Sequence, residues 1–232
     1  MKTIPSLISA LTTLALAILP ASASSYGDAT GDFTAGSWGD MTSVNVNNDA
    51  TTLTFKINTA GSPDLVANTW HQYYIGISEG LFGGVGGNLS TSSYGRNIQM
   101  GVGGLDFALL SYPAFSGYDR FTWNGASWVS GSGAGLASWD PSGVTINVSL
   151  AALGLSAGNT LTFDVWTSDS GSDTVLDALS DVTPRGFNAN PFNTGAGALS
   201  YTVSAVPEPA TCTLMVLGAL VMIRRVFSRN AK

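Results

Sequence analysis

The sequence predicts an all-β fold, an antiparallel β-sandwich, flanked by two terminal segments of a different character. Three observations predict it. Short runs of alternating apolar and polar residues recur along the chain, Gly, Asn, Asp and Pro separate these runs, and no long stretch repeats with the helical period of about 3.6 residues. The 28 glycines and the low charged content, 10% of residues, also suit an extracellular domain with many turns.

Nine runs are clear enough to be predicted as strands. In the run 52–57, Leu53, Phe55 and Ile57 share one face, and Thr or Lys residues occupy the other. This pattern suits two packed antiparallel sheets with one solvent-facing side each. The predicted strands are Ser43–Val46, Thr52–Ile57, Gln72–Ile77, Asn97–Val102, Phe107–Leu110, Arg120–Trp123, Val144–Ser149, Leu161–Thr167 and Leu199–Val203.

The distribution of charge restricts the partners of this domain. All fifteen acidic residues lie between Asp28 and Glu208, where only four basic residues occur, so this stretch has a formal net charge of −11. Such a surface repels nucleic acid and anionic lipid and attracts cations, although solubility alone is a sufficient reason for it. We therefore expect no nucleic acid partner. The single cysteine, Cys212, lies near the C-terminus, so the domain has no intramolecular disulfide and no cysteine-ligated metal site.

Residues 1–23 have the features of a secretory signal peptide. Lys2 provides the positive start, Leu7–Leu19 is apolar apart from Ser and Thr, and Ala21-Ser22-Ala23 is the small-residue pattern that signal peptidase accepts. The alternative is a membrane anchor, but the apolar run is shorter than the roughly 20 residues that a spanning helix needs. We expect cleavage after Ala23, which leaves residues 24–205 as the β-sandwich domain.

Residues 206–232 form a tail with three parts in a fixed order. Two prolines keep the chain extended, an apolar run, Thr211–Ile223, follows as a single membrane helix, and a basic end stays in the cytoplasm by the positive-inside rule. The alternative is an ordinary tail anchor, which would not need the proline-rich part. The residues that define the motif are Val206, Pro207, Glu208, Pro209, Arg224 and Arg225.

This order resembles the PEP-CTERM sorting signal of Gram-negative bacteria, over Val206 to about Arg225. The resemblance implies recognition by an exosortase-type membrane transpeptidase and cleavage near Pro207–Pro209. It also implies an inner-membrane intermediate, followed by delivery to the cell surface or the extracellular matrix. The same tail is sometimes labelled an ice-binding-protein C-terminal segment, and that label describes the tail rather than an activity of the domain.

The middle of the chain resembles jelly-roll domains of the family-9 carbohydrate-binding and DOMON-like group. The resemblance rests on the Asp-containing turns Gly27–Asp32 and Gly39–Val44. It also rests on Ala151–Leu155 followed by Gly158–Asp164, which fit a late strand pair of such domains. The resemblance implies a jelly-roll-like sandwich and makes an extracellular polysaccharide a candidate partner.

Two groups of aspartates are candidate calcium ligands. One group is Asp28, Asp32 and Asp40, and the other, across the Gly171 turn, is Asp169, Asp173 and Asp177. Ca²⁺ binds hard oxygen ligands on flexible turns, which is what these segments offer. The alternative is that the aspartates stabilise their own turns by bonding the local backbone, since neither spacing matches the regular calcium loop.

Tryptophans are the candidate ligand-binding residues. Trp123 and Trp128 flank the Asn124-Gly125 turn of a predicted hairpin, and Trp70 lies near another strand end. Aromatic faces stack on sugar rings, so an exposed pair would favour carbohydrate binding. Packing in the core is the alternative for each ring.

No catalytic residues are predicted. Gly76-Ile77-Ser78-Glu79-Gly80 matches the nucleophile-elbow string, but a glycine-rich stretch follows instead of a helix, and the only histidine, His71, precedes the serine. We therefore expect an exported, non-enzymatic surface or matrix protein with a structural or adhesive domain. The alternative is a carbohydrate-binding module, with or without bound calcium. A glycoside-active domain is the third interpretation, because the separation of paired carboxylates is a spatial quantity that the sequence does not give.

Overall fold

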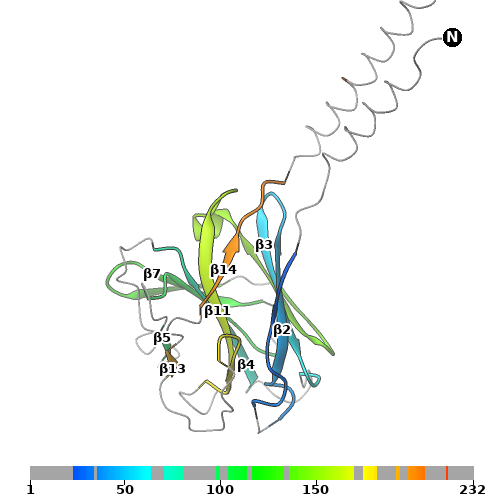
Figure 1. Cartoon of the computed structure of the whole chain (residues 1–232). Coiled ribbons are helices and arrows are strands. Elements are labelled where there is room, and N and C mark those ends of the chain that lie inside the picture. The colour runs from blue at the N-terminus through cyan, green and yellow to red at the C-terminus, as the bar shows by residue number, and fades with distance from the viewer. Residues whose placement is uncertain are drawn as a thin grey trace, which may run out of the picture.

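In the residues that it describes, the computed structural model is all-β, with two antiparallel sheets and almost no helix (Figure 1). This confirms the predicted fold class and the packing of two sheets. All nine predicted strands are present, although only Ile98–Gln99 of the fourth is described as strand. The described residues are 23–33, 36–63, 71–80, 98–99, 104–113, 117–132, 136–169, 175–181, 192–193, 198–206 and 218.

The first sheet has five strands in the order β1-β2-β3-β10-β9, and all of its pairs are antiparallel. Its strands are β1 (Ser24–Gly27), β2 (Met41–Asn48), β3 (Thr52–Thr59), β9 (Ala137–Asp140) and β10 (Gly143–Ser149).

The second sheet runs β12-β11-β4-β6-β7-β8, with β14 paired to β11 beside this path. A separate parallel pair joins β5 (Ile98–Gln99) to β13 (Phe192–Asn193). The other strands are β4 (His71–Ser78), β6 (Phe107–Ser111), β7 (Asp119–Trp123), β8 (Trp128–Ser132), β11 (Thr160–Asp169), β12 (Asp177–Ala178) and β14 (Leu199–Thr202).

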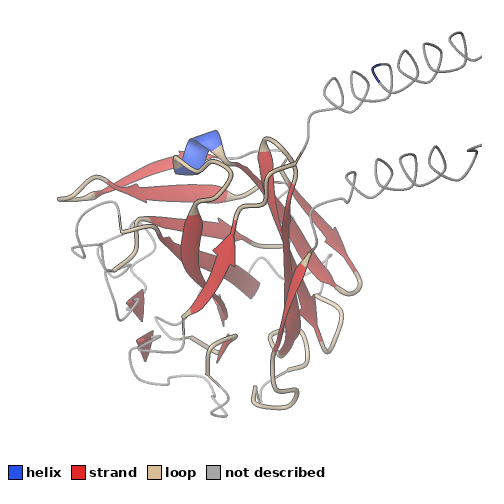
Figure 2. Ribbon diagram, turned by 45° about the horizontal axis from the view of Figure 1, so that its top comes forward, coloured by secondary structure: helices blue, strands red, loops and turns tan. Residues whose placement is uncertain are grey.

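The segment Ala151–Leu155 does not fit the expected late strand pair. Ala151–Leu153 forms a short 3-10 helix, drawn blue at the edge of the two layers in Figure 2. Gly154 ends it with φ 74°, a left-handed conformation that favours glycine. The segment is therefore a turn between β10 and β11.

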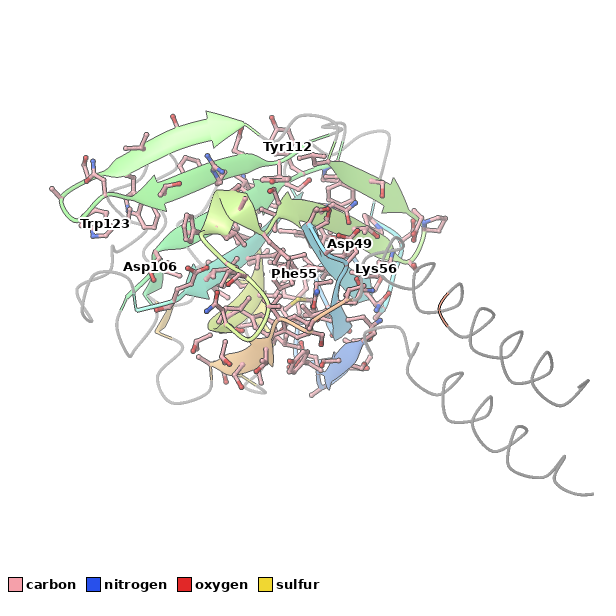
Figure 3. The ribbon with its side chains drawn as sticks, turned by 90° about the horizontal axis from the view of Figure 1, so that it is seen from above. Asp49, Phe55, Lys56, Asp106, Tyr112 and Trp123 are labelled. Atoms are coloured by element: carbon pink, nitrogen blue, oxygen red, sulfur yellow. The ribbon has the colours of Figure 1, made fainter. Side chains whose placement is uncertain are left out.

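The core lies between the sheets because the registers align the apolar faces. Ile57 is opposite Val144 and Phe55 is opposite Ile146 in the first sheet, so their side chains share one face. Phe163 of β11 meets the Phe55 ring edge-to-face from the second sheet, at 5.5 Å between centroids. Figure 3 shows Phe55 between the sheets.

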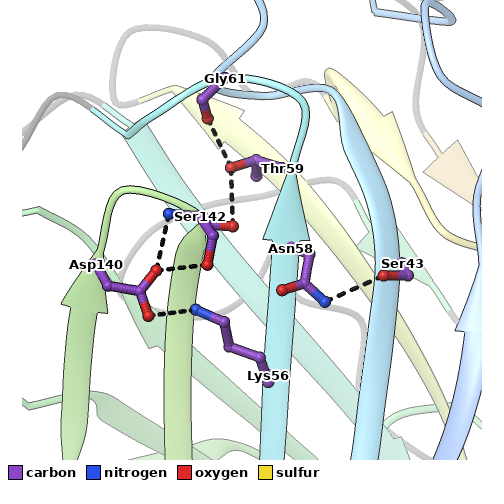
Figure 4. Close-up of polar contacts among 7 residues, drawn as sticks. All are labelled: Ser43, Lys56, Asn58, Thr59, Gly61, Asp140 and Ser142. Carbon is purple, nitrogen blue, oxygen red and sulfur yellow. Dashed lines mark hydrogen bonds and ion pairs between the residues drawn. The ribbon is translucent and has the colours of Figure 1, made fainter.

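The outer face of the first sheet is solvent-facing, as predicted. Lys56 Nζ lies 2.7 Å from Asp140 Oδ2, and Asn58 donates to Ser43 Oγ at 3.0 Å (Figure 4). The burial of β3 alternates accordingly between half-buried and buried residues.

The central strands of the second sheet are buried on both faces, which differs from the prediction. Every residue of β4 and β6 is buried. Trp166, which alternation places opposite the core, is fully buried and stacks on Tyr74 with 5.9 Å between ring centroids. A second apolar cluster therefore lies on the outer side of these central strands, formed by Tyr74, Leu105, Ala108, Leu110, Phe121, Trp166, Val175 and Ala178.

Candidate functional site

Three carboxylates gather at one edge of the sandwich. One oxygen from each of Asp28, Asp32 and Asp177 lies within 4.8 Å of the others. Asp28 and Asp32 lie in the loop after β1, and Asp177 starts β12 of the other sheet. We call these three residues the acidic cluster. The Asp28 N–H donates to the Thr42 carbonyl, near the start of β2. The acidic cluster therefore lies at the opposite end of the sandwich from the end of β14.

Hydrogen bonds fix both the loop and the strand that form the acidic cluster. Gly31, with φ 93°, turns the loop, and its N–H lies 2.9 and 3.0 Å from the two oxygens of Asp40. Asp177 Oδ2 accepts a 2.6 Å bond from the Met41 N–H, which connects β12 to β2 of the first sheet. Asp40 thus shapes the loop, and Asp177 links the two sheets.

The acidic cluster is an unusual electrostatic environment. Burial, and then repulsion by Asp32, raises the pKa of Asp28 to about 7. Burial raises the pKa of Asp177 to about 8, and the Met41 N–H bond only partly offsets it. Asp32 is 4% exposed, and neither of its oxygens accepts a hydrogen bond from the described residues. Burial also raises the pKa of Asp32.

A fourth buried carboxyl lies in the same region. Burial raises the pKa of Asp164, in β11, to about 7, although Ser180 Oγ donates to its Oδ2 at 2.6 Å. The negative charge of Asp164 contributes to the raised pKa of Asp28. Asp164 was not predicted, because in the sequence it is one polar position of an alternating strand.

The structure combines the two predicted aspartate groups in a different way. Asp177 of the second group joins Asp28 and Asp32 of the first. Both oxygens of Asp40 instead accept from the Gly31 N–H. Asp169 is not part of the acidic cluster. Asp173 lies outside the described residues.

The predicted tryptophan pair is present at the tip of the β7–β8 hairpin (Figure 3). Trp123 and Trp128 are opposite each other and half-buried, with ring centroids 5.6 Å apart at 61°. Asn124 closes the turn, because its Oδ1 accepts from the Ser127 N–H at 2.8 Å. Trp70 lies outside the described residues.

The two predicted processing segments lie next to the first and last described residues of the β-sandwich domain. Ala23 is the first described residue and β1 begins at Ser24, whereas Ala21 lies outside the described residues. Val206 is described, but Pro207, Glu208, Pro209, Arg224 and Arg225 are not.

The predicted membrane helix is also not described, apart from Gly218. Among the described residues, no helix combines the length and the apolar character needed to cross a membrane.

Asn48 holds the chain just before the tail. Its Nδ2 donates to the Ser204 carbonyl at 3.0 Å, and its Oδ1 accepts from the Ser204 N–H at 2.9 Å. The Tyr201 hydroxyl donates to the same Oδ1 at 2.7 Å. We call these contacts the Asn48 clamp.

The nucleophile-elbow string does not assemble a Ser-His pair. Ser78 and His71 are at opposite ends of β4, about 23 Å apart at ~3.3 Å per residue. The same string instead brings Glu79 to Asp106, whose Oδ2 accepts from the Glu79 N–H at 2.6 Å. Burial, and then repulsion by Asp106, raises the pKa of Glu79 to about 7. Sequence reasoning did not find this pair, since the two residues have no common motif.

No family model, no curated protein and no solved structure matches this chain. Function is therefore inferred from the residues and their geometry.

Proposed function

We propose that this protein is an exported β-sandwich module of structural or adhesive role, sorted to the cell surface or the extracellular matrix. The observation that supports the proposal most is the agreement between the edges of the folded domain and the two predicted processing segments. β1 begins at Ser24, directly after the expected signal peptidase site, and the Asn48 clamp ends at Ser204, two residues before Val206. Removal of both segments would leave every strand of the two sheets intact.

Both edges lie at the same end of the sandwich. Ser24 pairs with Val46 near the end of β2, and Asn48, the last residue of β2, holds Ser204. In Figure 1 this is the upper end, where the orange segment after β14 meets the turn between β2 and β3. A domain attached through one end presents its opposite end, which includes the loop from Asp28 to Asp40, to its surroundings.

In the proposed sequence of events, the signal peptide takes the chain through the inner membrane and signal peptidase removes it. The apolar tail helix then holds an inner-membrane intermediate, with Arg224 and Arg225 in the cytoplasm. An extended Pro-Glu-Pro segment suits the active site of an exosortase-type transpeptidase, and cleavage there separates the acidic domain from its basic anchor.

Mass spectrometry of the exported protein from an exosortase-containing host tests this proposal. We expect a chain that begins at Ser24 and lacks Thr211–Lys232. Replacement of Pro207, Glu208 and Pro209 by alanine should leave the protein in the inner membrane, as should a host without the transpeptidase. An exported chain that ends at Lys232, or normal surface delivery of the triple variant, would contradict the sorting proposal.

Carbohydrate binding is the alternative, and the Trp123–Trp128 pair is the observation in its favour. Two half-buried rings at a hairpin tip can stack on a sugar ring while the turn beside them stays folded. On a glycan array, with and without calcium, Trp123→Ala or Trp128→Ala in the full chain should weaken binding by about 1–3 kcal/mol. Val129→Ala, at a neighbouring position that is 52% exposed, is the matched control. Absence of glycan binding by the parent chain would remove this alternative.

A further inference from the structure

We infer that Asp28, Asp32 and Asp177 form a Ca²⁺ site that joins the two sheets at one edge of the sandwich. This inference goes beyond the proposed function, because sorting does not require an ion. The proposed ligands come from both predicted aspartate groups, so the site exists only in the folded chain.

The spacing of the carboxylates suits one ion. Each of the three residues has an oxygen within 4.8 Å of the others. Oxygens bind Ca²⁺ at about 2.3–2.6 Å, so two ligands on opposite sides of an ion lie about 4.6–5.2 Å apart. The three carboxylates are therefore close enough together to be ligands of one calcium ion.

The hydrogen-bonding state of the cluster indicates a ligand other than a protein group. Asp32 is 4% exposed, yet neither oxygen accepts a hydrogen bond from the described residues, and Asp28 Oδ2 is buried without one as well. A buried carboxylate is normally hydrogen-bonded, paired with a cation or bound to a metal, because its desolvation is costly. Buried carboxylate oxygens without a hydrogen-bond partner, with a third carboxylate within 4.8 Å, suit a bound cation.

The described basic side chains do not neutralise the cluster. Lys56 pairs with Asp140, and the Arg120 guanidinium donates to the Ala152 carbonyl at 3.4 Å. Arg96 and Arg185 lie outside the described residues. Within the described part of the chain, the charge of the cluster therefore has no cationic partner.

The ligand chemistry selects calcium. The cluster offers only carboxylate oxygens, whereas transition metals favour His or Cys, and the single histidine, His71, is instead stacked on Trp38 with 3.3 Å between ring centroids. Mg²⁺ demands octahedral geometry at about 2.0–2.1 Å and gives up water reluctantly. Ca²⁺ accepts the irregular geometry of a loop and a strand end, and water or carbonyl oxygens can complete its shell.

Asp40 acts here as a positioning residue. It holds Gly31 and so fixes the loop between Asp28 and Asp32. A bound ion would add a second link between the sheets beside the Asp177–Met41 hydrogen bond. The loop after the N-terminal strand would then be fastened to β12.

Thermal unfolding of the full chain, purified in a mild non-ionic detergent and treated with EDTA, tests the site. Tryptophan fluorescence is the signal, and 5 mM CaCl₂ or MgCl₂ is the probe. We expect Ca²⁺ to raise Tm by about 5–10 °C, because an ion that binds only the native state stabilises it by mass action, and Mg²⁺ to raise it less. Titration calorimetry with CaCl₂ should give one site per chain.

Two variants and a matched control locate the site. Asp32→Asn and Asp177→Asn should remove the calcium-dependent rise in Tm, whereas Asp140→Asn, a carboxylate in the exposed ion pair with Lys56, should retain it. Asp32→Asn decides the matter if Asp177→Asn does not fold, since Asp177 accepts from the Met41 N–H, whereas no described backbone N–H of another residue bonds Asp32.

Three results would overturn the inference. These are an unchanged Tm in the parent chain at 5 mM calcium, an undiminished rise in Asp32→Asn, and a larger rise with Mg²⁺ than with Ca²⁺.

Discussion

The Asn48 clamp gives the sharpest prediction for stability. Asn48 is 7% exposed, and its amide contacts both backbone groups of Ser204 and the hydroxyl of Tyr201, which is 3% exposed. Asn48→Ala removes these bonds and leaves the buried phenol without an acceptor. Each of the two lost bonds to Ser204 costs about 1 kcal/mol, and the Tyr201 hydroxyl left without an acceptor costs about 1–3 kcal/mol, so we expect a total loss of about 3–5 kcal/mol. For a domain of this size, that corresponds to a decrease in Tm of about 10 °C.

Urea unfolding of the full chain, followed by tryptophan fluorescence, measures this loss, with the m-value expected to stay constant. Tyr201→Phe removes the stranded hydroxyl, so the double variant should lose less than the two single variants together. The coupling should be about 1 kcal/mol. Additive costs, or a loss below about 0.5 kcal/mol in Asn48→Ala, would refute the reasoning, because the hydrogen bonds would then contribute little to the folded state.

Two further predictions test the packing and the electrostatics of the second sheet. A methyl group on Gly76 would lie 2.4 Å from the Trp166 ring, whereas one on Gly131 would meet nothing closer than 3.8 Å. In urea unfolding, Gly76→Ala should therefore lower the free energy of unfolding by about 2–3 kcal/mol, and Gly131→Ala by less than about 1 kcal/mol. Equal costs would contradict the tight packing. Burial raises the pKa of Glu79 from 4.5 to about 7 on folding, so the folded state holds a proton that the unfolded state releases, and stability falls as pH rises through this window. Glu79→Gln should reduce the slope of stability against pH between 4.5 and 7, and the raised pKa values of Asp28, Asp164 and Asp177 should maintain the rest of it. An unchanged slope would show that burial does not perturb the Glu79 carboxyl.

The strands were predictable because alternation is a local property. Leu53, Phe55 and Ile57 face one way in the sequence and lie in one buried face in the structure. The short β1, Ser24–Gly27, was not predicted, since its residues carry no apolar alternation and β2 pairs with it through the backbone. Alternation along β11 puts Trp166 on the side opposite the core, and it cannot reveal that a second apolar cluster buries that ring.

The sequence by itself determined the fold class, the separate character of the two ends and the excess of acidic residues. The tertiary structure alone decided which carboxylates meet. Asp177 accepts from the N–H of a residue 136 positions earlier in the chain and lies close to Asp28 and Asp32, whereas Asp169, only eight positions before Asp177, does not join them. The physical reason is that sequence spacing fixes neighbours only within one turn or strand, while contacts across a sandwich follow from strand order and register, which depend on the packing of the whole core.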